Sequence, residues 1–409
     1  YKRANMDRVT AAKQRVVTLD GLQAQKVRTQ AVVDQVRQAM LSPKTEKTPP
    51  KFNMTQLSAL TGLESTQLDN KLRRPGAGVP TGVKGNSTRR YFSVEDVQEW
   101  SRYLHPERVR PAQADAAVLV SANLKGGVSK TTTAVCLAHG LSLRGHKVLF
   151  VDLDPQASGT AFFGAAESQI NHDDTLFPLF QGEEFSVEYA IKSTYWPGID
   201  LVPSNAGMHG ADFLLSARQG QEIGFEFWDV LSRGLEIARG NYDIIVIDTP
   251  PSLSFTAING LMAADGFVMP LPPKSIDFAA TAQFWELFHE VVRLCKSPGR
   301  APKRFAFMDV VLSMVDSADK ATDVVREWIV AAYGEKVLPV EIPITNAAST
   351  ASKTFGSVYD LMVPGTVAER NVASSRTFKR AFEAYERLTD LIEGQILDFW
   401  TMQTVEVAR

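Results

Sequence analysis

The sequence predicts an α/β protein with a doubly wound, mostly parallel sheet, preceded by an N-terminal helix and a small helical domain. From Ala116 onward, short apolar runs alternate with longer helical stretches. Runs that are apolar on both faces are typical of parallel strands covered by helices on both sides. Before this body, a proline-bearing linker at residues 42–51 separates a long polar helical pattern from several short helical patterns. We therefore expect three parts, residues 1–50, 51–110 and 111–409.

The composition allows a large core and favours two functional halves. The chain has 409 residues, of which 44% are hydrophobic, enough for two or three domains. Residues 1–110 carry 20 Lys and Arg against 10 Asp and Glu, whereas the remainder carries 24 against 36. A basic front on an acidic body is typical of polyanion binding by the first part, although a solvated charged surface gives the same pattern.

Cysteine usage and hydropathy favour a cytoplasmic protein. Cys136 and Cys295 are too few for a disulfide framework or a cysteine-based metal site, which is typical of a reducing compartment. The longest apolar runs are much shorter than a membrane span, and no apolar segment follows the basic N-terminus. We expect a soluble protein that is neither exported nor membrane-bound.

The segment from 14 to 41 predicts one long polar helix. It lacks proline and brings a thin apolar stripe round at helical spacing, formed by Leu22, Val32, Val33, Val36 and Met40. A helix with such a stripe has to pack against another surface.

Residues 51–110 predict three short helices with a glycine-rich segment between the second and the third. The first runs from Met54 to a terminating Gly62, and the second begins at Ser65 as N-cap and ends before Pro75. The third begins at Ser93, with Asp96 as its capping-box partner. The short turn between the first two has the spacing of a helix-turn-helix, and the whole resembles a winged helix-turn-helix of the MerR type.

That resemblance implies DNA binding through the second helix and the wing. Lysine and arginine side chains would neutralise phosphates, and amide side chains can hydrogen-bond adenine edges. The candidates are Gln67, Asn70, Lys71, Arg73 and Arg74 on the helix and Lys84, Arg89 and Arg90 on or near the wing. A small helical interaction domain with a basic rim is the alternative.

The stretch "NLKGGVSKTTTAV", residues 123–135, has the context of a phosphate-binding loop between a strand and a helix. Backbone N–H groups in such a loop converge on phosphate oxygens at the positive end of the helix. Lys130 would reach the β and γ phosphates, and Thr131 would offer a hydroxyl to Mg²⁺. The strict pattern is missed twice, because Leu124 and Ser129 stand where glycines are expected.

The pattern "KGGxxKTT" resembles the deviant P-loop of the ParA/MinD superfamily of ATPases. The resemblance implies that Lys125 reaches across a dimer interface to the ATP of the other subunit and stabilises the charge of phosphoryl transfer. Members with N-terminal DNA-binding extensions commonly carry a side chain at the position of Ser129. The implied nucleotide contacts are Lys125, Gly126, Gly127, Val128, Ser129, Lys130, Thr131 and Thr132, with ATP or ADP and Mg²⁺ as ligands.

Two further motifs follow in the family's order. "VLFVDLDPQAS" resembles its "DxDPQ" motif and places Asp152 and Asp154 22 and 24 residues beyond Lys130. The resemblance implies that Asp154 orients the attacking water and that Asp152 supports the magnesium shell. "YDIIVIDTPPS" ends an apolar strand in Asp248, the expected Walker B carboxylate. Pro343 resembles the family's adenine contact, made largely by backbone.

The C-terminal part offers a local basic cluster within the acidic body. Its members are Lys353, Arg370, Arg376, Lys379 and Arg380. By resemblance these residues are candidates for nonspecific DNA binding, and a solvated helix face explains them equally well.

Within the superfamily, the chain resembles the large plasmid-type, or type Ia, partition ATPases over essentially its whole length. Cysteines for an iron–sulfur cluster are missing, and the acidic, mixed C-terminus does not match a membrane-binding helix. The resemblance implies a nucleoid-associated homodimer that uses the N-terminal helix and an ATP sandwich; whether the dimer assembles further on DNA is left open. It also implies a ParB-like partner, nonspecific DNA binding in the ATP state, and repression of its own operon through the winged domain. A transcriptional repressor in which ATP is only an allosteric ligand is the alternative.

Overall fold

The computed structural model describes residues 18–40, 47–73, 78–84, 89–165, 169–296, 302–316, 318–319, 321–344, 356–360 and 376–407. The chain divides into two compact units, Tyr1–Lys47 and Thr48–Arg409. The first contains helix α2 (Leu19–Met40), which confirms the long helix predicted there. Leu22 and Val32 of its apolar stripe are each 58% exposed, so these two apolar side chains lie largely open to solvent.

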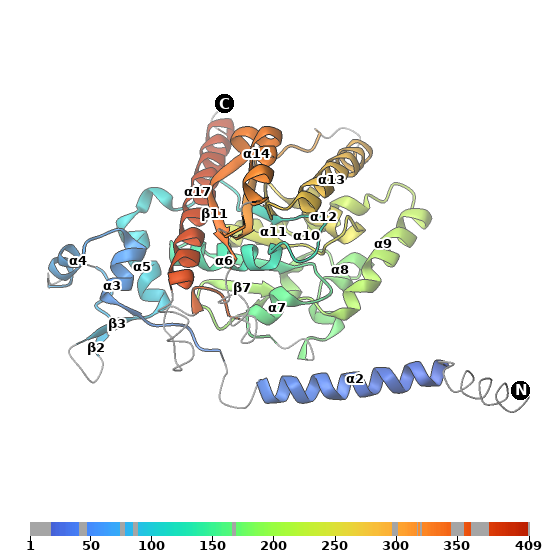
Figure 1. Ribbon diagram of the computed structural model, residues 1–409, viewed down its shortest axis with the longest axis horizontal. Coiled ribbons are helices and arrows are strands. Elements are labelled where there is room, and N and C mark those ends of the chain that lie inside the picture. Colours follow the sequence, from blue (N-terminus) through green and yellow to red (C-terminus); the bar gives the residue numbers. More distant parts are fainter. Residues whose placement is uncertain are drawn as a thin grey trace, which may run out of the picture. The chain divides into compact units, whose positions relative to one another are not determined.

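The second unit opens with the predicted short helices (Figure 1). The elements are β1 (Phe52–Asn53), α3 (Met54–Thr61), α4 (Ser65–Leu72), β2 (Val83–Lys84), β3 (Arg90–Phe92) and α5 (Val94–Leu104). Gly62 ends α3 with φ +69, and Ser93 caps α5 in a capping box with Asp96, as predicted. The predicted N-cap of α4 was wrong by one residue, because Glu64 occupies that position and Ser65 is already helical.

These elements enclose a small core that continues into the α/β body. Strands β1, β3 and β2 form an antiparallel sheet in that order; β2 and β3 pair within the glycine-rich stretch expected to be a wing, whereas β1 was not predicted. Phe52, Phe92 and Trp100 are fully buried beneath it. Helix α5 then contacts α6 (Lys130–Leu143), since the Gln98 amide donates to Ser142 Oγ over 2.7 Å and Ser101 Oγ donates to the Leu143 carbonyl over 2.8 Å. Residues 51–110 therefore pack directly on the α/β body.

The body is an eight-stranded sheet in the order β11-β10-β9-β4-β8-β5-β7-β6. The strands are β4 (Ala117–Ser121), β5 (Val148–Asp152), β6 (Lys192–Ser193), β7 (Ile199–Val202), β8 (Ile244–Asp248), β9 (Gly266–Leu271), β10 (Phe307–Val315) and β11 (Val337–Pro343). Strands β4, β5 and β7 to β11 coincide with the short apolar runs that follow Ala116 in the sequence, and they pair in parallel as predicted. The two-residue edge strand β6, antiparallel to β7, was not predicted.

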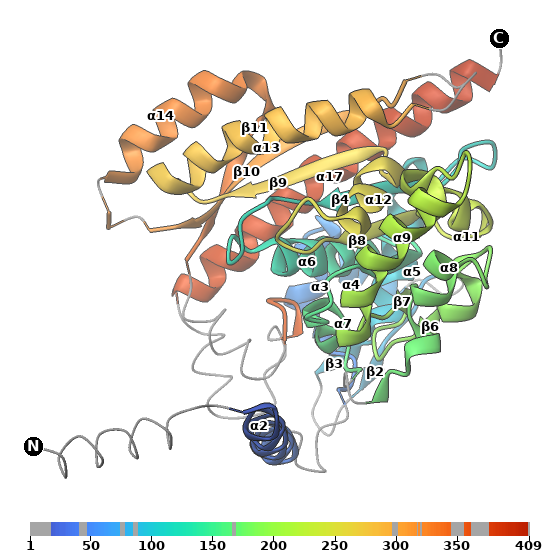
Figure 2. The ribbon, with the colours of Figure 1, turned by 90° about the vertical axis from the view of Figure 1, so that its right-hand side faces the viewer.

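Helices cover both faces of this sheet, as a doubly wound fold requires. Alternate residues of β4 enter two separate cores, Ala117 and Leu119 on one side and Val118 and Val120 on the other. The remaining helices are α7 (Ser158–Phe162), α8 (Phe177–Gln181), α9 (His209–Gln221), α10 (Val230–Gly234), α11 (Glu236–Asn241), α12 (Phe255–Ala263), α13 (Ser275–Leu294), α14 (Ala321–Tyr333) and α17 (Arg376–Val407). Figure 2 shows α13 and α14 lying along β9 and β10.

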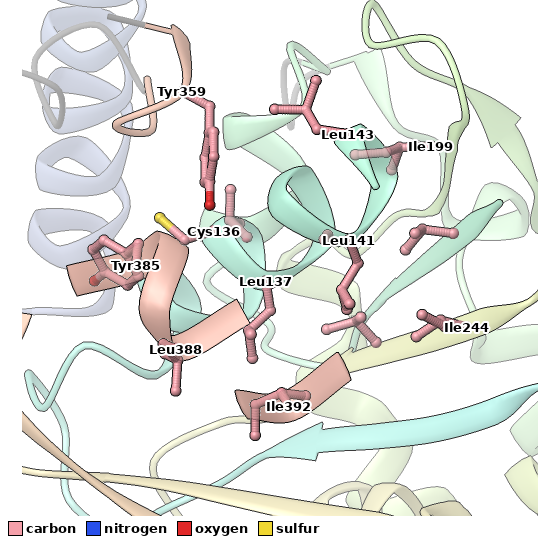
Figure 3. Packing of buried hydrophobic residues seen from close by; sticks show 14 of the residues in the cluster. Cys136, Leu137, Leu141, Leu143, Ile199, Ile244, Tyr359, Tyr385, Leu388 and Ile392 are labelled. Atoms are coloured by element: carbon pink, nitrogen blue, oxygen red, sulfur yellow. The ribbon is translucent and has the colours of Figure 1, made fainter. Parts of the chain in front are cut away.

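The buried helix α6 is enclosed by the C-terminal helix α17 and by residues 356–360 (Figure 3). Leu137 and Leu141 face Leu388 and Ile392 of α17, and all four are at most 1% exposed. Both cysteines are free and buried. No described helix is long and apolar enough to cross a membrane.

Candidate nucleotide site

The candidate site lies where β4, β5 and β8 end. Ser121 pairs with Asp248 across β4 and β8, and Asp152 pairs with the same Asp248 across β5 and β8. Because parallel strands end at one edge of the sheet, the three predicted motifs meet there although they are far apart in sequence. This edge is also where open α/β sheets bind ligands.

The loop between β4 and α6 has an unusual backbone at its end. Gly127 and Ser129 have φ angles of +74° and +72°, a left-handed conformation that glycine adopts most readily. The described chain has two other non-glycine residues with positive φ, Ala157 and Met314. Ala157 follows the "DLDPQ" segment, and Met314 follows Ser313, whose hydroxyl donates to the Val128 carbonyl over 3.0 Å. Strained residues of this kind cluster at functional sites, and all three adjoin this loop or its motifs.

Lys130 is the first residue of α6, and its ammonium points back toward the preceding loop. Its Nζ donates to the backbone carbonyl of Lys125 over 3.0 Å, and the residue is 6% exposed. Burial lowers the pKa of Lys130, while the carboxylates of Asp248 and Asp154 partly oppose that shift. The helix N-terminus, the loop amides and this ammonium together make a site for an anion.

Asp152 and Asp248 are both fully buried but differ in their partners. Asp152 accepts hydrogen bonds from the backbone N–H groups of Asp154 and Thr160 and from the Thr160 hydroxyl. Neither carboxylate oxygen of Asp248 has a hydrogen-bond partner in the described residues. Burial is the main cause that raises the pKa of both, to about 7 for Asp152 and well above its usual value for Asp248.

The unsatisfied oxygens of Asp248 fit a bound cation. A buried carboxylate without a partner is costly unless a positive charge or a proton satisfies it. The Thr131 hydroxyl lies near enough to lower the pKa of Asp248, without a well-aligned hydrogen bond to either oxygen. No group of three or more His, Cys, Asp or Glu in the described residues could hold a metal. The Asp248 carboxylate beside the Thr131 hydroxyl is a donor set that suits Mg²⁺, which is commonly bound by one carboxylate, a hydroxyl, waters and phosphate oxygens.

Asp154 stands at the entrance to this edge. It is 8% exposed, and its Oδ1 accepts a hydrogen bond of 2.9 Å from the backbone N–H of Gln156. Burial raises its pKa, and the hydrogen bond from the Gln156 backbone N–H, the Lys130 ammonium and the nearby His209 partly oppose the rise. His209, the first residue of α9, was not singled out from the sequence because no local motif marks it.

The front lysine, Lys125, contacts an acid that the sequence did not indicate. Its Nζ forms an ion pair with Oδ1 of Asp277, the third residue of α13. Gly126, beside it, lies close to Pro251, since a side chain there would meet the Pro251 ring at 3.7 Å. Pro343, in contrast, ends β11, which β10 and β9 separate from β4.

The candidate DNA-binding residues of the N-terminal part have mixed surroundings. Asn70, Lys84 and Arg89 are exposed. Gln67 has its side-chain carbonyl occupied by the Glu64 backbone N–H at 3.2 Å, inside the helix cap. Three further candidates contact neighbouring groups. Lys71 Nζ lies 5.0 Å from the Tyr103 ring centroid, Arg73 pairs with Asp69 at 2.9 Å, and Arg90 donates to the Thr81 carbonyl.

Three exposed basic residues, Arg376, Lys379 and Arg380, begin α17. Arg74, Lys353 and Arg370 lie outside the described residues.

The parallel sheet, the strand–loop–helix around Lys130 and the acidic residues at the same edge define this chain as a P-loop NTPase. A protein-family model described as an AAA domain matches residues 116–297. A Rhizobium rhizogenes protein provisionally named replication protein A is 29% identical over 381 residues, covering 88% of this chain and 90% of that protein. The chromosome partitioning protein ParA of Caulobacter vibrioides is 33% identical over 263 residues, covering 63% of this chain and 92% of ParA.

Two solved structures share the fold. A Mycobacterium smegmatis cobyrinic acid a,c-diamide synthase with bound ATP analog and magnesium is 26% identical, with a TM-score of 0.51 over 68% of this chain and 94% of that one. A structure described as a partition protein matches 85% of this chain and 99% of that chain with a TM-score of 0.56 and 20% identity. The chain belongs to the ParA/MinD superfamily of partition ATPases.

Proposed function

We propose that the protein is an ATP-dependent, homodimeric DNA partition ATPase. In this proposal the ATP dimer binds DNA nonspecifically and positions DNA cargo bound by a ParB-like protein, and hydrolysis resets the cycle. The observation that carries the proposal is that the loop contains a lysine, Lys125, in addition to Lys130. Lys130 already supplies the ammonium that a single-subunit phosphate site needs. Lys125 is 35% exposed at the loop's front, where a second subunit can be reached.

The chain's own residues divide the work as follows. Backbone N–H groups from Gly126 to Thr132 and the Lys130 ammonium bind the phosphates. Thr131 and Asp248 would hold Mg²⁺, with Asp152 supporting that region through its hydrogen bonds to α7. When bound, the ion neutralises phosphate charge. Asp154, oriented by the backbone N–H of Gln156, positions the attacking water. Pro343 is the proposed adenine contact.

Residues 51–110 supply a winged helix-turn-helix for specific DNA in this proposal, through which the ADP or nucleotide-free protein represses its own operon. In support, α3 and α4 are joined by a short turn, and the β2–β3 ribbon precedes α5. The net positive charge of this region favours DNA as the ligand. The cluster at the start of α17 would bind DNA nonspecifically, and α2 would contribute to the dimer. The protein would act in the cytoplasm on the nucleoid.

A steady-state ATPase assay with DNA and the ParB-like protein tests the motor. We expect weak hydrolysis alone and a clear increase when both are added. Without stimulation, the alternative stands, a repressor in which ATP is only an allosteric ligand. Asp154 favours turnover over that alternative, because a pure nucleotide sensor needs the phosphate cradle but no water-orienting carboxylate.

Lys125→Ala tests the shared site. The variant should bind ADP normally and form no ATP-dependent dimer in analytical ultracentrifugation, and an unchanged dimer would contradict the in-trans role.

The two modes of DNA binding should separate by mutation. Arg73→Ala should weaken binding to the operator and reduce its salt dependence, with ATP-dependent nonspecific binding intact. Arg293→Ala is a matched control, since Arg293 is also an exposed, locally paired arginine but lies on α13. Equal loss of both modes in Arg73→Ala would refute the division.

A further inference from the structure

Lys125 and Asp277 form an ion pair whose two ends differ in exposure. The Lys125 side chain is 35% exposed, whereas that of Asp277 is 6% exposed. Within the described part of the chain, Asp277 Oδ1 has no hydrogen-bond partner besides this contact with the Lys125 ammonium, which supplies the counter-charge of the carboxylate. The nearly buried acid therefore depends on the lysine more than the lysine depends on the acid.

The backbone around Lys125 is arranged to make this contact. The Lys125 N–H donates to Asn123 Oδ1 over 3.1 Å, and the Asn123 amide donates to the Pro270 carbonyl over 2.9 Å. Pro270 is the next-to-last residue of β9, close to the connection to α13. Asn123 thus ties the front of the loop to the strand that leads into the helix carrying Asp277.

Moving Lys125 away has an energetic consequence. Removing one partner of a buried ion pair is strongly destabilising because it leaves an uncompensated charge. The position of Asp277 in the first turn of α13 softens this cost, since a helix N-terminus favours negative charge. Because part of this free-energy cost remains, the ion pair opens only when another anion attracts Lys125 more strongly than Asp277 does.

We propose that Asp277 is a positioning residue that holds Lys125 against its own subunit and so sets the ATP concentration at which two subunits pair. This inference rests on the proposed in-trans role of Lys125. The lysine exchanges one anionic partner, Asp277, for another, the phosphates on the second subunit. ATP carries one more phosphate group than ADP, so the same competition favours pairing with ATP over pairing with ADP.

The test compares Asp277→Asn with a matched control in the full-length protein. Asp323→Asn is the control, because Asp323 is also the third residue of a helix, α14, but its side chain is 68% exposed and pairs locally with Arg326. Sedimentation would measure the dimer fraction against ATP and ADP concentration. We expect Asp277→Asn to lower the half-maximal ATP concentration at least about fivefold, the lower end of typical coupling between sites. Asp323→Asn should match the wild type, and Asp277→Glu should restore the wild-type threshold.

Two results would overturn the inference: an unchanged threshold in Asp277→Asn, or a weaker dimer, which would mean that the acid supports Lys125 within the dimer. Lys125→Ala separates this failure from failure of the proposed function. If Lys125→Ala abolishes the dimer while Asp277→Asn leaves it unchanged, the positioning role alone is lost; if Lys125→Ala still dimerises, the shared site itself is lost.

A second measurement needs no variant to fold. Acetylation of lysines in the nucleotide-free wild-type chain, mapped by peptide mass spectrometry, should label Lys125 several-fold more slowly than the exposed neighbour Lys274. Equal labelling of the two amines would contradict the ion pair.

Discussion

Asp309 in β10 allows a quantitative test of how much a buried carboxylate destabilises the fold. It lies within β10, pairs in register with Val268 of β9, and is 5% exposed. Its Oδ2 has no hydrogen-bond partner in the described residues, and burial raises its pKa to about 6 from a usual value of 3.8. At neutral pH the folded protein therefore carries a poorly solvated charge, which Asp309→Asn removes with little change of shape.

The size of the effect follows from the shift. A rise of about two pKa units, at roughly 1.4 kcal/mol each, means that the ionised carboxylate lowers the free energy of unfolding by about 3 kcal/mol. Because the pKa of the folded state lies above that of the unfolded state, the destabilisation is nearly absent below pH 3.8, grows as the pH rises, and is complete above pH 6. Asp309→Asn should therefore raise the free energy of unfolding by up to about 3 kcal/mol at pH 8 and by about half of that at pH 5.

Thermal unfolding of the wild type, Asp309→Asn and the exposed control Asp398→Asn at pH 8 and pH 5 measures this. The Asp309→Asn substitution should raise Tm by several degrees at pH 8 and by less at pH 5, and the control should not change it. An equal gain at both pH values, or a loss at pH 8, would refute the reasoning, because the carboxylate would then have a favourable partner.

Three further changes test other parts of the molecule. Asp154→Ala should lower the stimulated rate of phosphate release at least about 100-fold while ATP dimers persist in sedimentation; a retained rate would exclude the water-orienting role. Gly140→Ala places a methyl group 2.6 Å from the Tyr359 hydroxyl and should cost about 1–3 kcal/mol in denaturant unfolding, whereas wild-type stability would show that the contact yields easily. Glu393 is buried and lies 3.6 Å from Arg144; burial acts to raise its pKa, but a neighbouring histidine and two arginines lower it overall. Glu393→Gln should therefore destabilise by about 3 kcal/mol at pH 7, and the difference should shrink below pH 4.5, where the wild-type carboxyl protonates; a pH-independent difference would count against the ion cluster.

Most of the fold was predictable because its signals are local. The seven parallel strands are apolar runs that the chain itself marks; α3 ends at Gly62 and α5 begins after Ser93, the two capping residues that the sequence indicated. The misses have a common cause. Strand β6 has two residues and forms only because β7 lies beside it, and Glu64 rather than Ser65 caps α4 because the backbone at Glu64, not the residue type alone, selects the cap.

For the candidate site, too, the sequence identified the residues but not their contacts. The loop of residues 123–135, Asp152, Asp154 and Asp248 were found from sequence, since each motif is continuous and its chemistry depends on residue type and spacing. The different hydrogen bonding of the two buried carboxylates was not found from sequence: Asp152 accepts hydrogen bonds from Thr160, whereas neither oxygen of Asp248 has a partner among the residues that the structure describes. Which carboxylate is free depends on neighbours contributed by other strands and helices.

The sequence by itself determined that the chain builds a parallel sheet with a two-lysine phosphate loop, because hydrophobic periodicity and short-range motifs are written in consecutive residues. Only the tertiary structure decided what the front lysine contacts. Lys125 and Asp277 are 152 positions apart in the sequence and meet because β9 lies next to β4 and delivers the start of α13 beside the loop. Such a pairing depends on strand order, which long-range packing sets and no local pattern encodes.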